Sequence, residues 1–172
     1  MEFSPANTAD IEAIEGIITQ CQEGLTLQGI LQWDALYPSR SYFQQALVEG
    51  ALFVLTEADS VRGVVVLDER QPPEWSAVKW MEAGGRSLVV HSFAVLPSAQ
   101  GRGYGGAMLG YCEAFARSNG YTTMRLDAFS ENAGALRFYE RHGYRFQGAI
   151  ELAFKPIGHR RYLCYEKLLT LP

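Results

Sequence analysis

A strand, a glycine cluster, a helix and a second strand follow one another in the middle of the chain, and this pattern most constrains its fold. The segment SLVVHSFAVL, residues 87–96, is β-rich and apolar on both faces, which is typical of a central strand. Glycines cluster at 100–106, a helical pattern runs over 107–118, and an alternating strand pattern follows at 122–129. This order predicts one parallel crossover within a sheet.

The flanking segments predict antiparallel strands and further helices. Two β-rich runs, 51–57 and 61–68, are separated by three residues and predict an antiparallel hairpin. Apolar spacing and end signals predict the remaining helices at 8–22, 41–48 and 133–142, and the last strands at 144–150 and 161–169. We therefore expect an α/β fold with a mixed, mostly antiparallel sheet of about six or seven strands, flanked by about four helices. It forms a single domain over residues 1–172.

Composition and charge exclude several classes of protein. Hydrophobic residues make up 48% of the chain, enough for a substantial core. The net charge of −4 disfavours a nucleic-acid-binding protein, and no apolar run approaches the roughly 18 residues of a membrane span. The N-terminal residues include acids and lack the basic region of a signal peptide. We expect a cytoplasmic protein with neither a nucleic-acid nor a membrane partner.

The three cysteines, Cys21, Cys112 and Cys164, are far apart and form no C-x-x-C pair. This spacing argues against a zinc site and against a disulfide framework. We expect reduced, mostly buried thiols and no bound metal.

The glycine cluster, QGRGYGG at 100–106, matches the dinucleotide fingerprint G-x-G-x-x-G literally, and Asp127 stands where that fingerprint expects an acid. The spacer 97–100 is too long for that fold, however, and the hairpin upstream is antiparallel. Glycines before a helix still let backbone amides approach an anion, and Arg102 adds a cation. The cluster therefore predicts a phosphate or pyrophosphate site, with a glycine turn that binds no ligand as the alternative.

Several motifs together resemble the GNAT-type N-acetyltransferases of bacteria. Residues 100–105 are similar to the family's coenzyme A loop, Q/R-x-x-G-x-G/A, and residues 93–97, FAVLP, to its L-A-V-x-P strand end. Downstream, residues 132–144 are similar to N-x-x-A-x-x-x-Y-x-x-x-G-F, and CYEK at 164–167 resembles the end of many members. The resemblance covers most of the chain, and it implies that the parallel pair of strands is splayed.

The resemblance implies acetyl-CoA as co-substrate and assigns residues to it. The backbone of Phe93 and Val95 would bond to the pantetheine arm like an added strand. Asn132 would bond to the pantetheine or the strand edge, and Tyr139 would lie near the sulfur. The implied cofactor-binding residues are Phe93, Ala94, Val95, Gln100, Gly101, Arg102, Gly103, Tyr104, Gly105, Gly106, Asn132, Ala135 and Tyr139.

Acetyl transfer to an amine needs a base for the amine, a donor for the oxyanion and an acid for the thiolate. The family's donor is a backbone N–H near Val95, and Tyr139 is the candidate acid, with a core aromatic as its alternative role. The strand 87–96 holds no carboxylate, so its His91 becomes the candidate base. The alternative for His91 is a buried histidine with a structural hydrogen bond.

The acceptor site is expected in the loop before residue 41, where Trp33, Asp34 and Tyr37 are the candidates. Asp34 would attract a cationic amine; the alternative is a packed connection between helices. Trp75 and Trp80, in the Pro- and Gly-punctuated insertion 70–86, are candidates for a lid or for a contact in a homodimer.

The leading hypothesis is an acetyl-CoA-dependent N-acetyltransferase. It would act on a primary amine of a small molecule or peptide by direct attack in a ternary complex. The alternative is a non-catalytic acyl-CoA-binding sensor on the same fold, because the central strand lacks a carboxylate. A third hypothesis is an NAD-binding oxidoreductase, which would bind NADH and not coenzyme A.

Overall fold

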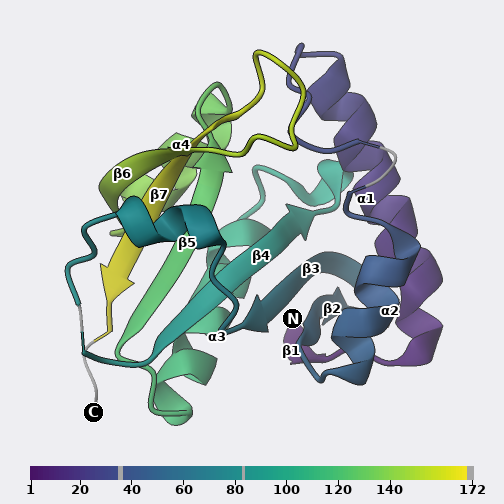
Figure 1. The fold of residues 1–172 in the computed structure, drawn as a ribbon. Coiled ribbons are helices and arrows are strands. Elements are labelled where there is room, and N and C mark those ends of the chain that lie inside the picture. Colours follow the sequence, from purple (N-terminus) through teal and green to yellow (C-terminus); the bar gives the residue numbers. More distant parts are fainter. Residues whose placement is uncertain (35–36, 83, 170–172) are drawn as a thin grey trace. The chain divides into compact units, whose positions relative to one another are not determined.

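The computed structural model describes residues 1–34, 37–82 and 84–169, and Figure 1 shows their helices and strands. Seven strands form one sheet in the order β1-β2-β3-β4-β5-β7-β6. The chain divides into two compact units. The first contains residues 1–68 and 90–112, and the second contains residues 69–89 and those from 113 onward.

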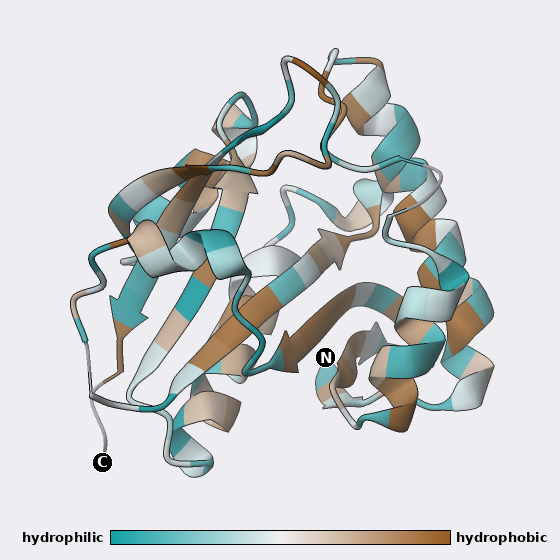
Figure 2. Cartoon of the chain, viewed as in Figure 1, coloured by the Kyte–Doolittle hydropathy of each residue, from teal (hydrophilic) through white to brown (hydrophobic). Residues whose placement is uncertain are grey.

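The first unit packs two helices against antiparallel strands (Figure 1). Its elements are β1 (Glu2–Pro5), α1 (Ile11–Thr26), α2 (Arg40–Val48), β2 (Leu52–Glu57), β3 (Ser60–Asp68), the end of β4 (Ser87–Val95) and the start of α3 (Tyr104–Ser118). Ile11, Ile14 and Ile18 recur at helical spacing, and all three are buried in one cluster with Val64 and Val66 of β3. The apolar strands stand out in Figure 2, β3 above all.

The entry to α1 differs from the expected one. A short 3₁₀ turn at Thr8–Asp10 precedes the helix, and its cap is Asn7. The Asn7 side chain accepts a hydrogen bond from the Ala9 N–H at 2.8 Å, and Asp10 accepts one from the Asn7 N–H at 2.8 Å. Reciprocal bonds of this kind satisfy amides that a helix start leaves without partners.

The β2–β3 hairpin turns tightly and then loses its regular register. Ala58 and Asp59 both have left-handed backbone angles, with φ of 48° and 59°, which is the geometry of a two-residue hairpin turn. Leu55 pairs with Gly63, whereas Thr56 pairs with Val61. Arg62 is therefore an extra residue in β3, and the strand carries a β-bulge there.

The second unit contains the parallel pair of strands. Its elements are η2 (Pro73–Ala77), the start of β4, the end of α3, β5 (Thr123–Phe129), α4 (Ala133–Arg141), β6 (Arg145–Glu151) and β7 (Arg161–Leu168). Residues 87–89 of β4 pair in parallel with 123–125 of β5. The last strand, β7, runs between β5 and β6 and is antiparallel to both.

The expected fold class is confirmed: the sheet is mixed, with seven strands, one parallel pair and four α-helices among the described residues. The bounds of two helices are corrected. Helix α1 spans Ile11–Thr26 and not residues 8–22. Helix α3 begins at Tyr104 and not at Ala107, so Gly105 and Gly106 lie in its first turn. None of the helices in the described ranges is long and apolar enough to cross a membrane.

The insertion 70–86 is fixed to the sheet of its own unit. Trp75 is buried, and its indole N–H donates to the Asp127 carboxylate of β5 at 3.0 Å. Asp127, which stands at the acidic position of the dinucleotide fingerprint, is therefore a partner of Trp75. A Cβ added at Gly85 would lie 1.9 Å from the Thr122 hydroxyl, so the glycine there allows close packing.

A buried ion pair also fixes the insertion 70–86 to the strands of its own unit. Glu166 of β7 is fully buried, and it accepts hydrogen bonds from the Met81 N–H at 2.5 Å and from Arg125 Nε at 2.8 Å. The Arg125 guanidinium also lies 4.3 Å from the centre of the Trp80 ring. The contact with Arg125 thus positions Trp80 within the second unit.

Candidate functional site

The glycine cluster forms an open backbone loop that leads into α3. Gly101 and Gly103 have φ of 72° and 89°, which only glycine adopts without cost. The first helical hydrogen bond at this end joins the Ala107 N–H to the Gly103 carbonyl at 3.0 Å. The amides of residues 103–106 therefore precede the helical ladder, at the positive end of the helix dipole.

Open space surrounds this loop. A Cβ added at Gly101 or at Gly103 would meet no protein atom within 4 Å. Arg102, between them, is exposed and carries a fixed positive charge. Backbone amides, a helix N-terminus and a cation in open space fit a pyrophosphate group.

The residues before the loop brace it against β4. The Gln100 side-chain amide donates to the Val95 carbonyl at 3.0 Å, and the Cys21 thiol of α1 lies 3.5 Å from the same oxygen. The Gln100 side chain therefore stabilises the conformation of the loop. Its other polar atoms would make any contact with a ligand.

His91 in the middle of β4 has a carboxylate partner. Its Nε2 lies 3.1 Å from Oδ1 of Asp68, the last residue of β3, and the two side chains are 23% and 14% exposed. The pair is thus half-buried, with access to solvent. A carboxylate bonded to one ring nitrogen orients a histidine ring.

The next residue, Ser92, has a left-handed backbone with φ of 49° inside the strand. Such a conformation costs a non-glycine residue energy and is found most often at functional sites. The Ser92 hydroxyl lies 3.1 Å from the Tyr37 hydroxyl. Tyr42 packs edge-on against Tyr37, and burial raises its pKa above the ordinary value, so it stays protonated.

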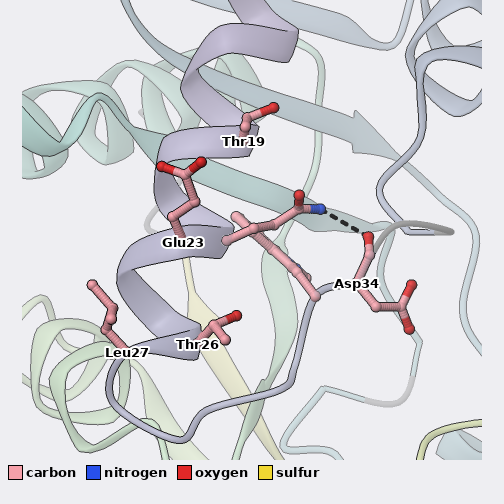
Figure 3. A pocket seen from close by; sticks show the side chains of 7 residues that line it. Thr19, Glu23, Thr26, Leu27 and Asp34 are labelled. Atoms are coloured by element: carbon pink, nitrogen blue, oxygen red, sulfur yellow. Dashed lines mark hydrogen bonds between the residues drawn. The ribbon is translucent and has the colours of Figure 1, made fainter.

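A pocket of about 550 Å³ lies beside the C-terminal end of α1 (Figure 3). Its lining residues are Thr19, Gln22, Glu23, Thr26, Leu27, Trp33 and Asp34. The Gln22 side chain donates to the Asp34 carbonyl at 2.8 Å, which ties the loop to the helix. Glu23 and Asp34 contribute two carboxylates to this lining, and Trp33 contributes an indole ring.

The three candidate acceptor residues lie close together within the first unit, because Asp34 and Tyr37 exchange backbone hydrogen bonds of 2.9 and 3.2 Å. Trp33 and Asp34 line the pocket, whereas Tyr37 bonds to Ser92 of β4. Residues 35 and 36, between them, lie outside the described ranges.

The candidates in the second unit cluster around the start and middle of α4. The Asn132 side-chain oxygen accepts from the Ala135 N–H at 3.1 Å and so caps the helix. Tyr139 is 8% exposed, and its ring packs edge-on against Phe138 and Tyr144, with centroids 5.3 and 5.8 Å away. The packing fixes the Tyr139 ring, whichever role its hydroxyl has.

The cysteines are buried and form no disulfide, as expected. Burial raises the pKa of the Cys21 thiol to about 11 and that of Cys164 to about 12, the latter also through the nearby charge of Asp127. Within the described ranges, no three His, Cys, Asp or Glu side chains gather as a metal site would require.

Sequence reasoning did not identify Asp68 or Ser92. A weak signal for both is present: His91 and Ser92 interrupt an otherwise apolar strand, and Asp68 ends the apolar run of β3. The sequence could not show that these residues meet their partners, which are 23 and 55 positions away.

Comparisons with known proteins agree with this arrangement. Residues 19–144 match the acetyltransferase (GNAT) family. The "Uncharacterized N-acetyltransferase YesJ" of Bacillus subtilis (strain 168) is 30% identical over 148 residues, which cover 84% of this chain and 82% of that protein.

Solved structures share the fold. An acetyltransferase of the GNAT family from Streptococcus agalactiae 2603 has a TM-score of 0.85 at 20% identity, over 97% of this chain and 94% of that one. The ribosomal-protein-S18-alanine N-acetyltransferase of Escherichia coli has a TM-score of 0.71 at 17% identity, over 99% and 95% of the two chains.

Proposed function

This chain belongs to the acetyltransferase (GNAT) family, and we propose that it transfers an acetyl group from acetyl-CoA to a primary amine. The acceptor is a small molecule or a peptide, and it attacks directly in a ternary complex. The observation that carries the proposal is the open glycine loop at the start of α3, where glycines 101 and 103 leave room for a phosphate. When bound, acetyl-CoA supplies the acetyl group as a thioester.

His91 is proposed as the base that removes a proton from the ammonium form of the acceptor. Its contact with Asp68 at 3.1 Å supports this role, because the carboxylate holds the ring in one orientation for the proton transfer. Asp68 also weakens the argument for a non-catalytic acyl-CoA-binding sensor, which rests on the missing carboxylate. The central strand holds no carboxylate of its own, yet its neighbour β3 supplies one.

Tyr139 is proposed as the acid that returns a proton to the sulfur, and Asn132 and Ala135 as contacts of the co-substrate. These assignments rest on the family resemblance of residues 132–144. The rigid packing of the Tyr139 ring supports a positioned hydroxyl. An oxyanion donor near Val95 is proposed on the same resemblance.

The acceptor is proposed to enter past Trp33, Asp34 and Tyr37. The two carboxylates of the pocket, Glu23 and Asp34, support a cationic amine as substrate. A cytoplasmic location without metal, nucleic acid or membrane partner is proposed from composition and motifs. A single catalytic domain over 1–172 is proposed from the family resemblance.

The test is release of the free coenzyme A thiol with a panel of polyamines, amino acids, aminoglycosides, arylalkylamines and peptide N-termini. We expect turnover with at least one amine, and losses of about 10²–10⁴-fold in kcat for Tyr139→Phe and His91→Gln. The coenzyme A affinity of His91→Gln should be unchanged. Binding of coenzyme A without turnover on any amine would favour the sensor. Tight binding of NADH without binding of coenzyme A would overturn the family-based function.

A further inference from the structure

The bulge in β3 places Arg62 in an unusual setting. Pairing passes from Leu55–Gly63 to Thr56–Val61, and Arg62 has no partner residue in β2. Bulges redirect a side chain and are common beside functional sites. On the other edge, the Arg62 carbonyl accepts from the Leu96 N–H at 2.8 Å, directly before the segment that leads to the glycine loop. Arg62 is thus tied to the entry of that loop.

Arg62 forms no ion pair within the part of the chain that the structure describes. Its side chain is half-buried, and its Nε is buried without a hydrogen-bond partner among the described residues. Neither Arg62 nor Arg102 forms an ion pair with any residue in the described ranges. A buried N–H donor without a partner costs free energy, which a turn of the side chain toward a ligand acceptor would recover.

Arg62 and Arg102 lie around the same residue. The guanidinium of Arg102 is 5.9 Å from the centre of the Tyr104 ring, at the start of α3. The bond to Glu57 raises the pKa of the Tyr104 hydroxyl, and the charges of Arg102 and Arg62 oppose this rise more weakly, so both charges act at this point.

The first unit contains few cations besides Arg62 and Arg102. The unit holds three arginines, no lysine and ten carboxylates. The third arginine, Arg40, is neutralised by an ion pair with Glu15. The two cations of this strongly acidic unit that form no ion pair among the described residues therefore both lie at the glycine loop, with one carboxylate, Glu57, beside them, and they attract an anion there.

We propose that Arg62, with Arg102, binds the 3′-phosphate of coenzyme A. The inference rests on the proposed function, in which the amides of residues 103–106 hold the pyrophosphate. Coenzyme A carries a second anionic group, the 3′-phosphate on its ribose. The amides leave that group without a partner, and a guanidinium matches it through paired N–H donors.

Titration calorimetry with coenzyme A and with dephospho-coenzyme A, which lacks the 3′-phosphate, tests the proposal on the intact chain. Arg62→Met keeps the apolar stem and removes the charge. We expect it to weaken coenzyme A binding by about ten- to a hundredfold and to leave dephospho-coenzyme A binding within about twofold of wild type. Arg62→Lys should recover part of the loss. Arg40→Met is the matched control, with the same change of charge in the same unit, and should bind both ligands normally.

Three results would overturn the proposal. They are equal losses for the two ligands, no loss for either, or an equal loss in Arg40→Met. A melting curve of each variant separates loss of the site from loss of the fold, and Arg62→Lys is the informative variant if Arg62→Met unfolds. If the wild-type protein binds no coenzyme A at all, the proposed function itself fails, which is distinct from an Arg62 variant that binds like the wild type.

Discussion

Alanine at Gly103 would test whether the glycine loop holds a phosphate through its backbone. The residue has φ of 89°, and an added Cβ would project into open space. The substitution therefore has two effects, backbone strain and a methyl group where an anion must approach. Only the second concerns the ligand, so the two must be measured separately.

A matched glycine lies in the connection between β6 and β7. Gly158 has φ of 85°, and a Cβ there would also meet no atom within 4 Å. A left-handed alanine costs about 1–2 kcal/mol, of which about 0.4–1 kcal/mol is offset by the stiffer unfolded chain. Gly103→Ala and Gly158→Ala should each lower the free energy of unfolding by about 1 kcal/mol, which for a chain of this size is about 2–4 °C in Tm.

The two variants should differ in ligand binding. In Gly103→Ala, the loss of one charge-assisted hydrogen bond to the pyrophosphate, about 1.5–3 kcal/mol, corresponds to about a 10- to 150-fold rise in the Kd for coenzyme A. Gly158→Ala should retain the wild-type Kd. Titration calorimetry measures both values and thermal unfolding measures the strain. Wild-type affinity in Gly103→Ala, or an equal loss in Gly158→Ala, would refute the role of the loop.

Two further predictions concern the strand β4 and the buried thiols. Ser92→Ala should lower the free energy of unfolding by about 0.5–1.5 kcal/mol, because the hydrogen bond between the Ser92 and Tyr37 hydroxyls is lost. Ser92→Gly should be more stable than Ser92→Ala in urea unfolding, because φ of 49° favours glycine; the reverse order would mean that the backbone there is not strained. Burial raises the pKa of Cys21 to about 11 and that of Cys164 to about 12, from 9.0. The two buried thiols therefore make their full contribution to the free energy of unfolding below pH 9. This contribution falls as the pH rises from 9 toward 12, because the thiols ionise more readily in the unfolded chain. Thermal unfolding against pH should show a shallower fall for Cys164→Ala; an identical slope would contradict the assignment.

Local signals predicted most of the elements. The β-rich runs that became β2 and β3, and the apolar spacing of α1, depend on neighbouring residues alone, so the sequence was sufficient for them. The glycine loop was also predictable, because left-handed angles at Gly101 and Gly103 require glycine. The sequence predicts the start of α3 three residues too late. Glycines are typical of loops, whereas Gly105 and Gly106 lie in the first turn of this helix.

Contacts between distant residues were decided by the tertiary structure. The sequence by itself determined the family motifs, the fold class and the position of the loop, all of which depend on short spacings. The contacts of His91 with Asp68, of Ser92 with Tyr37 and of Trp75 with Asp127 join residues 23, 55 and 52 positions apart. Such pairs depend on strand register, and a single bulge such as the one at Arg62 shifts every residue beyond it. No local pattern records that shift, so only the folded chain could bring an unpaired arginine to the loop that the sequence had already identified.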